Sequence, residues 1–115
     1  MLLKSAEIQP FDFDGLSIRD YTAAIESSSS FAHIRVLPGI HHRRARSTRS
    51  DKYYYILSGQ LRLSVDNTDS ILDVGDLYVI AKGQTFSYVN ETEQSVELLL
   101  IHTPSFDLAA EVFEE

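Results

Sequence analysis

The chain has 115 residues, of which 43% are hydrophobic and none is cysteine. This length fits one domain with a core large enough to fold without disulfides. The lack of cysteine excludes disulfide frameworks, thiolate nucleophiles and cysteine-based metal sites. A formal net charge of −7 argues against nucleic acid as a partner. No run of about 18 apolar residues occurs, so we expect no membrane-spanning helix and no membrane partner.

The N-terminal part of the chain is predicted to be an extension of a strand-rich domain. Residues 1–10 contain one lysine and no apolar stretch, so we expect no signal peptide and a cytoplasmic location. Residues 1–30 are assigned to the extension and the first strands, and the serine run 27–30 is predicted to be a loop. Residues 21–27 form one of two segments with a pattern that a helix can adopt.

The middle of the chain has the short alternating segments of an all-β protein. We predict strands over residues 31–37, 53–57, 61–65, 77–81, 86–89 and 96–102 because β-branched and aromatic residues are concentrated there. Turn-forming residues separate these segments at short intervals. Many short strands at close spacing predict a sandwich or a barrel. In the tail, residues 108–115, Asp107 can cap a helical turn containing Ala109, Ala110 and Val112.

Half of the ten basic residues lie in one window of ten positions. They are Arg43, Arg44, Arg46, Arg49 and Lys52. The window has two interpretations that the sequence leaves open. It is either a solvated surface segment or, if it lines a pocket, a local anion site on an acidic protein.

The glycines of the chain are spaced in a pattern of their own. Gly39 and Gly59 enclose one segment, and Gly75, Gly83 and Asn90 mark a second. This spacing resembles the two sequence motifs of the cupin family, and residues 53–59 and 104–107 also resemble segments of small cupins. The resemblance covers roughly residues 31–107. It implies a cupin jelly-roll β-barrel, in which Gly59 and Gly75 turn the chain with positive φ.

The same resemblance implies that the usual metal site has lost its ligands. The three histidine positions of the motifs fall on Ala45, Ser47 and Phe86, and the glutamate position falls on Lys52. Cupin metals are held by three imidazoles and a carboxylate, which suit a divalent transition ion. We therefore expect neither metal nor cofactor. A relocated site built from His33, one of the adjacent His41 and His42, and His102 is the alternative.

The ligand positions of a cupin point into its barrel, so the resemblance places residues 45, 47, 52 and 86 inside. The period of two along a strand adds Tyr54, Ile56 and Tyr88 to the interior. Tyrosines can stack on a small ligand, and cations can hold its carboxylate or phosphate. The candidate ligand-binding residues are Arg35, Lys52, Tyr54, Tyr88, His33 and His102.

Three functions are compatible with these residues. The first is a metal-free barrel that binds a small anionic or sugar-like molecule. The second is a metal-independent isomerase or epimerase acting on a sugar derivative, with His33 or His102 and a tyrosine as acid and base. The third is an interaction module with a filled barrel. By analogy with the family we also expect a homodimer, to which Leu2, Leu3, Ile8 and Phe11 can contribute.

Overall fold

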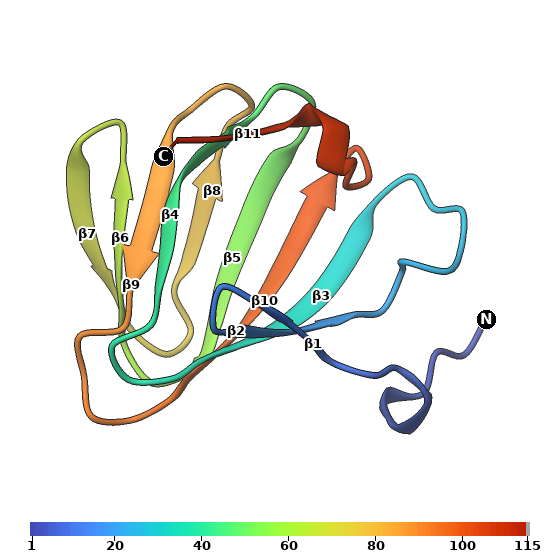
Figure 1. The fold of residues 1–115 in the computed structure, drawn as a ribbon, viewed down its shortest axis with the longest axis horizontal. Helices are drawn as coiled ribbons and strands as arrows, with labels where there is room; N and C mark the ends of the chain where they lie inside the picture. The colour runs from blue at the N-terminus through green and yellow to red at the C-terminus, as the bar shows by residue number, and fades with distance from the viewer. Residues whose placement is uncertain (115) are drawn as a thin grey trace.

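The structure is a computed structural model in which residues 1–114 are described. Glu115, the end of the predicted tail, lies outside the described residues. The elements of residues 1–114 are short strands and two 3-10 turns (Figure 1). In chain order they are η1 (Ser5–Glu7), β1 (Phe11–Phe13), β2 (Leu16–Asp20), β3 (Ser30–Val36), β4 (His41–Ser47), β5 (Asp51–Ser58), β6 (Leu61–Val65), β7 (Thr68–Leu72), β8 (Leu77–Ile80), β9 (Phe86–Val89), β10 (Val96–Thr103), η2 (Leu108–Ala110) and β11 (Glu111–Phe113).

The strands form two antiparallel sheets that face each other (Figure 1). The larger sheet has the order β1-β2-β3-β10-β5-β8, and the smaller one has the order β11-β4-β9-β6-β7. Neighbours in each sheet are mostly distant in sequence, as in the wrapped topology of a jelly roll. The predicted all-β jelly-roll barrel is therefore confirmed. Within residues 1–114, no helix is long and apolar enough to cross a membrane.

The core lies between the two sheets and follows from the alternation of the strands. In β10 every second residue is buried, beginning with Val96 and ending with His102. β5 alternates in the same way, so that Lys52, Tyr54 and Ile56 point inward. Each inward face joins one continuous apolar cluster, which is the arrangement expected when two sheets pack face to face.

The motif glycine and asparagine positions serve the framework. Gly59 has φ +81°, and a Cβ atom there would lie 2.7 Å from the carbonyl oxygen of Ser95. Asn90 is fully buried, and its amide donates to the carbonyl oxygens of Val36 and Gln94 at 2.9 and 2.7 Å. These residues therefore fix turns and strand ends. The positive φ expected at Gly59 is confirmed.

The structure differs from the sequence prediction at both ends of the chain. Residues 21–27 form turns and no helix. Asp107 caps the turn η2 by accepting from the amide of Ala109 at 3.0 Å, as predicted. Val112 is not in that turn, however, because the chain continues as β11 and pairs with β4. The sequence predicts no strand at β4, β7 or β11, and it gives no bounds for β1 and β2, which lie in the predicted first strands of residues 1–30, since each is short or rich in polar residues.

Candidate functional site

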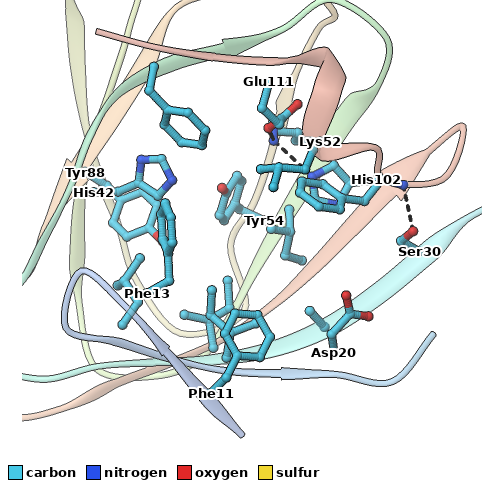
Figure 2. Close-up of a pocket in the computed structure, with 18 residues that line it drawn as sticks. Phe11, Phe13, Asp20, Ser30, His42, Lys52, Tyr54, Tyr88, His102 and Glu111 are labelled. Carbon is cyan, nitrogen blue, oxygen red and sulfur yellow. Dashed lines mark hydrogen bonds and ion pairs between the residues drawn. The ribbon is translucent and has the colours of Figure 1, made fainter. Parts of the chain in front are cut away.

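A cavity of about 250 Å³ lies between the two sheets. Its walls are mainly apolar and aromatic, with Phe11, Phe13, Phe106 and Phe113 among them. Figure 2 shows Asp20 and Ser30 on the wall together with two further groups of polar side chains, and Tyr54 lies between these two groups. One group is His42 and Tyr88, and the other is Lys52, Glu111 and His102. A small apolar pocket with a few converging polar groups is the usual form of a small-molecule site.

The positions that the cupin motifs assign to metal ligands all point inward, as predicted. Ala45, Ser47, Lys52 and Phe86 are each no more than 3% exposed. The Lys52 ammonium nitrogen lies 5.2 Å from the centroid of the Phe86 ring. The ammonium group therefore already places a cation among these four positions. None of the four side chains is an imidazole or a carboxylate. These residues do not fit a divalent metal, whose ligands they would have to supply.

The relocated histidine site is not formed in the described part of the chain. Within residues 1–114, no three His, Asp or Glu side chains converge on a point where they could hold a metal ion. His102 is buried on the inner face of β10, whereas His33 binds Glu97 on the other face of the same sheet. His41 is exposed. The adjacent histidines thus point in different directions, as the sequence predicted for an extended segment.

A buried ion pair with a histidine occupies one side of the cavity. Lys52 on β5 and His102 on β10 are direct cross-strand partners, and the Lys52 ammonium donates to Nε2 of His102 over 2.9 Å. The same ammonium forms an ion pair and hydrogen bond with Oε1 of Glu111 on β11. The Lys52 and Glu111 side chains are only 4% and 5% exposed. The C-terminal strand therefore supplies the anion that balances this lysine.

Burial controls the protonation of this cluster. Desolvation, followed by the positive charge of Lys52, lowers the pKa of His102 to about 3. His102 is consequently neutral at pH 7, and its Nε2 lone pair can accept from the ammonium. Desolvation also lowers the pKa of Lys52, while the Glu111 carboxylate acts in the opposite direction. The pair adds no net charge to the cavity.

A histidine and a tyrosine face each other on the opposite side of the cavity. His42 on β4 pairs with Tyr88 on β9, and their ring centroids are 5.2 Å apart. The register shifts between His42 and Ala45. Such a bulge turns a strand residue toward the opposite face. His42 thereby lines the cavity, while Arg43 remains exposed.

The bulge also fixes the tautomer of His42. The Nδ1 atom lies 2.6 Å from the carbonyl oxygen of Arg43. Because a carbonyl can only accept, Nδ1 carries the proton and Nε2 keeps its lone pair. Desolvation is the main cause that lowers the pKa of His42 to about 4, with a further contribution from the charge of Lys52. His42 is thus a neutral imidazole, and Nε2 has no hydrogen-bond partner among residues 1–114.

The Tyr88 hydroxyl is the second unpaired polar group of this wall. It is buried and has no hydrogen-bond partner in residues 1–114. Desolvation raises the pKa of Tyr88, and the pKa of Tyr54 is raised well above its usual range for the same main reason. Both hydroxyls therefore keep their protons and can donate. A buried hydroxyl without a partner is costly unless a ligand or water satisfies it.

The structure brings together four of the six predicted binding residues. Lys52, Tyr54, Tyr88 and His102 line the cavity. The expectation that Arg35 faces the cavity is wrong. Its guanidinium binds Glu97 at 2.7 Å on the outside of the larger sheet.

His33 is likewise outside the cavity, with Nε2 2.9 Å from the Glu97 carboxylate. The physical reason is that Ala32, Ile34 and Val36 of β3 are buried, so the alternating residues must point outward. The basic side chains of the window are correspondingly on the surface, apart from that of its last residue. Its four arginines are exposed, and only Lys52 enters the barrel.

His42 and Glu111 are among the cavity residues that the sequence did not predict. The sequence suggests His42 only as a metal ligand, and the strand period counted from Ala45 places Arg43 inside instead. Only the bulge reverses this order. Glu111 lies beyond the motifs in the tail, where no pattern indicates a strand that returns to the barrel. The one signal for a functional residue in β4 was the adjacent pair His41 and His42, close to the predicted inward position of Ala45.

The sequence profile of the cupin domain family matches residues 32–102. This chain is a cupin. No curated protein sequence shows a significant match to it.

Several solved cupin structures share the fold. Pac13, a nucleoside dehydratase, superposes with a TM-score of 0.88 at 20% identity, over 100% of this chain and 91% of that chain. A variant of Pac13 from Streptomyces with uridine gives a TM-score of 0.87 at 20% identity, over 99% and 90% of the two chains. KdgF from Halomonas gives 0.82 at 16% identity, over 93% of this cupin and 96% of that chain. At these identities the likeness shows the fold.

Proposed function

We propose that this cupin binds a small, neutral, sugar- or nucleoside-like molecule in its cavity and catalyses proton transfer on it without a metal. The observation that carries the proposal is the juxtaposition of the unpaired Tyr88 hydroxyl with the free Nε2 of His42 on the cavity wall. The Tyr88 hydroxyl is buried and can donate, whereas His42 is half-buried and its Nε2 can only accept. A ligand with hydroxyl and carbonyl groups can satisfy both at once.

The charge balance favours a neutral ligand over an anionic one. An anion would need an unmatched cation in the cavity, but Lys52 is already paired with Glu111. Arg35, the other predicted anchor, is outside the barrel. A volume of about 250 Å³ is just below the range of about 300–1,000 Å³ typical of drug-sized pockets, which suits a sugar or a nucleoside. The same volume argues against the filled-barrel module.

His42 is suited to act as a general base. It is neutral at pH 7, and its tautomer is held by the Arg43 carbonyl. Tyr88 and Tyr54 keep their protons and can donate to a substrate oxygen. These roles replace the sequence-based choice of His33 or His102, since His33 is outside and His102 already accepts from Lys52. A positioned base paired with a donor is the arrangement that acid–base catalysis requires.

The Streptomyces neighbour supports a nucleoside as one candidate ligand. That enzyme is a nucleoside dehydratase and its structure has been determined with uridine. Dehydration is itself an acid–base reaction, since a proton and a hydroxyl leave as water. The His42–Tyr88 pair of this cupin provides groups for such a reaction, and uridine is therefore the first ligand to test.

We expect uridine to bind the wild-type protein and to bind the Tyr88→Phe variant about tenfold more weakly. The variant removes one buried hydroxyl donor and leaves the ring in place. Isothermal titration calorimetry measures both affinities. The matched control is Tyr55→Phe, because Tyr55 is 39% exposed on the outer face of the larger sheet. Equal affinities for the Tyr88→Phe and Tyr55→Phe variants would contradict the proposed role of Tyr88.

A homodimer is also proposed. Apolar side chains lie on adjacent strands of the larger sheet, where the exposed Leu77 and Val79 of β8 pair with the exposed Tyr55 and the half-buried Tyr53 of β5. Contiguous apolar surface of this kind is often buried by association, and a two-fold axis would place the patch against itself. Light scattering should give twice the 13.0 kDa protomer mass, and Leu77→Lys should shift it toward 13.0 kDa. A monomeric wild-type protein at micromolar concentration would contradict this.

We further propose that residues 1–115 act as one domain in the cytoplasm and that nucleic acid and membranes are not partners. The absence of cysteine and the net charge of −7 support these proposals.

A further inference from the structure

One N–H group of the Lys52 ammonium has no acceptor within residues 1–114. An ammonium group carries three protons. One is donated to Nε2 of His102 over 2.9 Å and one to Glu111, and no third acceptor occurs in residues 1–114. Lys52 lines the cavity, as Figure 2 shows. The third N–H is therefore available to an oxygen atom of a ligand.

The position of this donor is as informative as its chemistry. Lys52 stands at the glutamate position of the first cupin motif, and its ammonium lies 5.2 Å from the ring of Phe86, at the histidine position of the second. A positive charge is thus fixed in the region of the barrel where other members of the fold family hold a metal. Glu111 balances that charge and, together with His102, orients it. A fixed donor in a water-poor site stabilises charge that develops on an oxygen.

We propose that Lys52 takes the place of the metal as the electrophile of the site, and that the substrate carries a carbonyl group whose oxygen accepts the third ammonium N–H. The inference rests on the proposed function and narrows it to α-hydroxy carbonyl compounds, such as ketoses and aldoses. A carbonyl oxygen is the acceptor whose charge grows when the neighbouring carbon loses a proton.

The proton-transfer step balances without a cofactor. Nε2 of His42 accepts a proton from the carbon next to the carbonyl. The C–H electron pair forms a carbon–carbon double bond, and the carbonyl π pair moves to the oxygen, where the Lys52 N–H stabilises the negative charge. The oxygen pair then re-forms the carbonyl while a proton returns to the same carbon, which gives exchange with solvent or, from the opposite face, epimerisation. Alternatively, the oxygen pair re-forms the carbonyl, the carbon–carbon π pair moves to the next bond, and the hydroxyl on the next carbon leaves as water with the proton from His42. No oxidant or reductant is needed.

The test follows deuterium uptake from D₂O into D-ribulose, a neutral ketose, by proton NMR. Removing Lys52 alone would leave the Glu111 carboxylate buried without a partner. The variant is therefore Lys52→Met/Glu111→Gln, which removes both charges and keeps the side-chain lengths. We expect wild-type protein to exchange the protons next to the carbonyl and the double variant to do so at least about 100-fold more slowly. Its thermal melt checks that the barrel is folded.

The matched control removes the same pair of charges outside the cavity. Arg35→Met/Glu97→Gln should exchange D-ribulose at the wild-type rate, since both residues lie on the outer face. Wild-type exchange rates in the folded Lys52→Met/Glu111→Gln variant would overturn the inference. So would a D-ribulose adduct trapped on Lys52 by borohydride, because Lys52 would then be a nucleophile.

Uridine affinity separates the inference from the function on which it rests. Wild-type protein that binds uridine but exchanges no protons of D-ribulose would overturn the carbonyl inference and leave ligand binding in the cavity standing. Wild-type protein that neither binds uridine nor exchanges D-ribulose would overturn both.

Discussion

Glu111→Ala is expected to lower the free energy of unfolding by about 3–5 kcal/mol, because it leaves the Lys52 ammonium buried without its anion. The two side chains are almost completely buried, so water cannot replace the lost carboxylate. Stabilities of small domains are about 5–15 kcal/mol, which makes this loss a large fraction of the total. Urea unfolding monitored by circular dichroism measures it directly.

Two comparisons identify the cause of that loss. Glu114→Ala changes the same residue type in the same tail, but the Glu114–Arg44 pair is about half exposed and should contribute less than about 1 kcal/mol. Lys52→Met/Glu111→Gln should recover much of the stability, since no unmatched charge remains. If Glu111→Ala costs no more than Glu114→Ala, the buried ion pair does not exist as described.

The pH dependence of the Glu111→Ala variant gives a further check. Without the carboxylate, burial holds the pKa of Lys52 below its value in the unfolded chain. The unfolded state then binds more protons than the folded state between these two pKa values, so stability rises with pH there. The penalty is fully present only below the folded-state pKa. This loss of stability should shrink as the pH rises between the two pKa values and should largely vanish near pH 10, close to the pKa of lysine in the unfolded chain.

His42→Gln is expected to slow the exchange of D-ribulose protons by about 10²–10⁴-fold, the usual contribution of a general base. Glutamine keeps a polar side chain of similar length, but its amide cannot accept a proton near pH 7. The rate is measured by deuterium uptake. Because His41 and His42 are adjacent, His41→Gln is a closely matched control with the same chemical change at an exposed position. Equal rates for the two variants would show that His42 is not the base.

The pKa of His42 sets the pH profile that we expect for the proposed exchange reaction. Burial lowers the pKa of His42 to about 4, and a base acts only in its unprotonated form. We therefore expect the exchange rate to stay level from pH 8 to about pH 5 and to fall as the pH drops through about 4. A fall centred near the ordinary histidine value of about 6.5 would indicate that His42 is not buried in the protein in solution.

The fold was predictable because its signals are local and redundant. Period-two alternation in residues 61–65 and the concentration of β-branched and aliphatic residues in residues 96–102 predict strands, and both segments are strands in the structure. Gly59 is required by backbone geometry and by the close approach of Ser95, so it marks the barrel whether or not a metal site is present. Short polar strands such as β11 lack such signals, since pairing with β4 alone defines them.

The candidate site was predictable only where it follows the regular strand period. Lys52, Tyr54 and Tyr88 were placed inside correctly because their strands keep that period up to the cavity. His42 enters the cavity only because β4 has a bulge, which no residue pattern of this segment signals. Glu111 is brought to Lys52 by a tail that folds back over the barrel, a long-range contact that no local pattern records.

The most direct test of a ligand site in this barrel is an NMR measurement of contacts between bound uridine and the aromatic rings of the protein. Nuclear Overhauser effects should connect uridine protons with the rings of Tyr54, Tyr88 and His42, which surround the cavity (Figure 2). They should be absent from Tyr55 on the outer face. Contacts confined to the outer face, or an absence of uridine binding, would contradict the proposal that this cavity is the functional site.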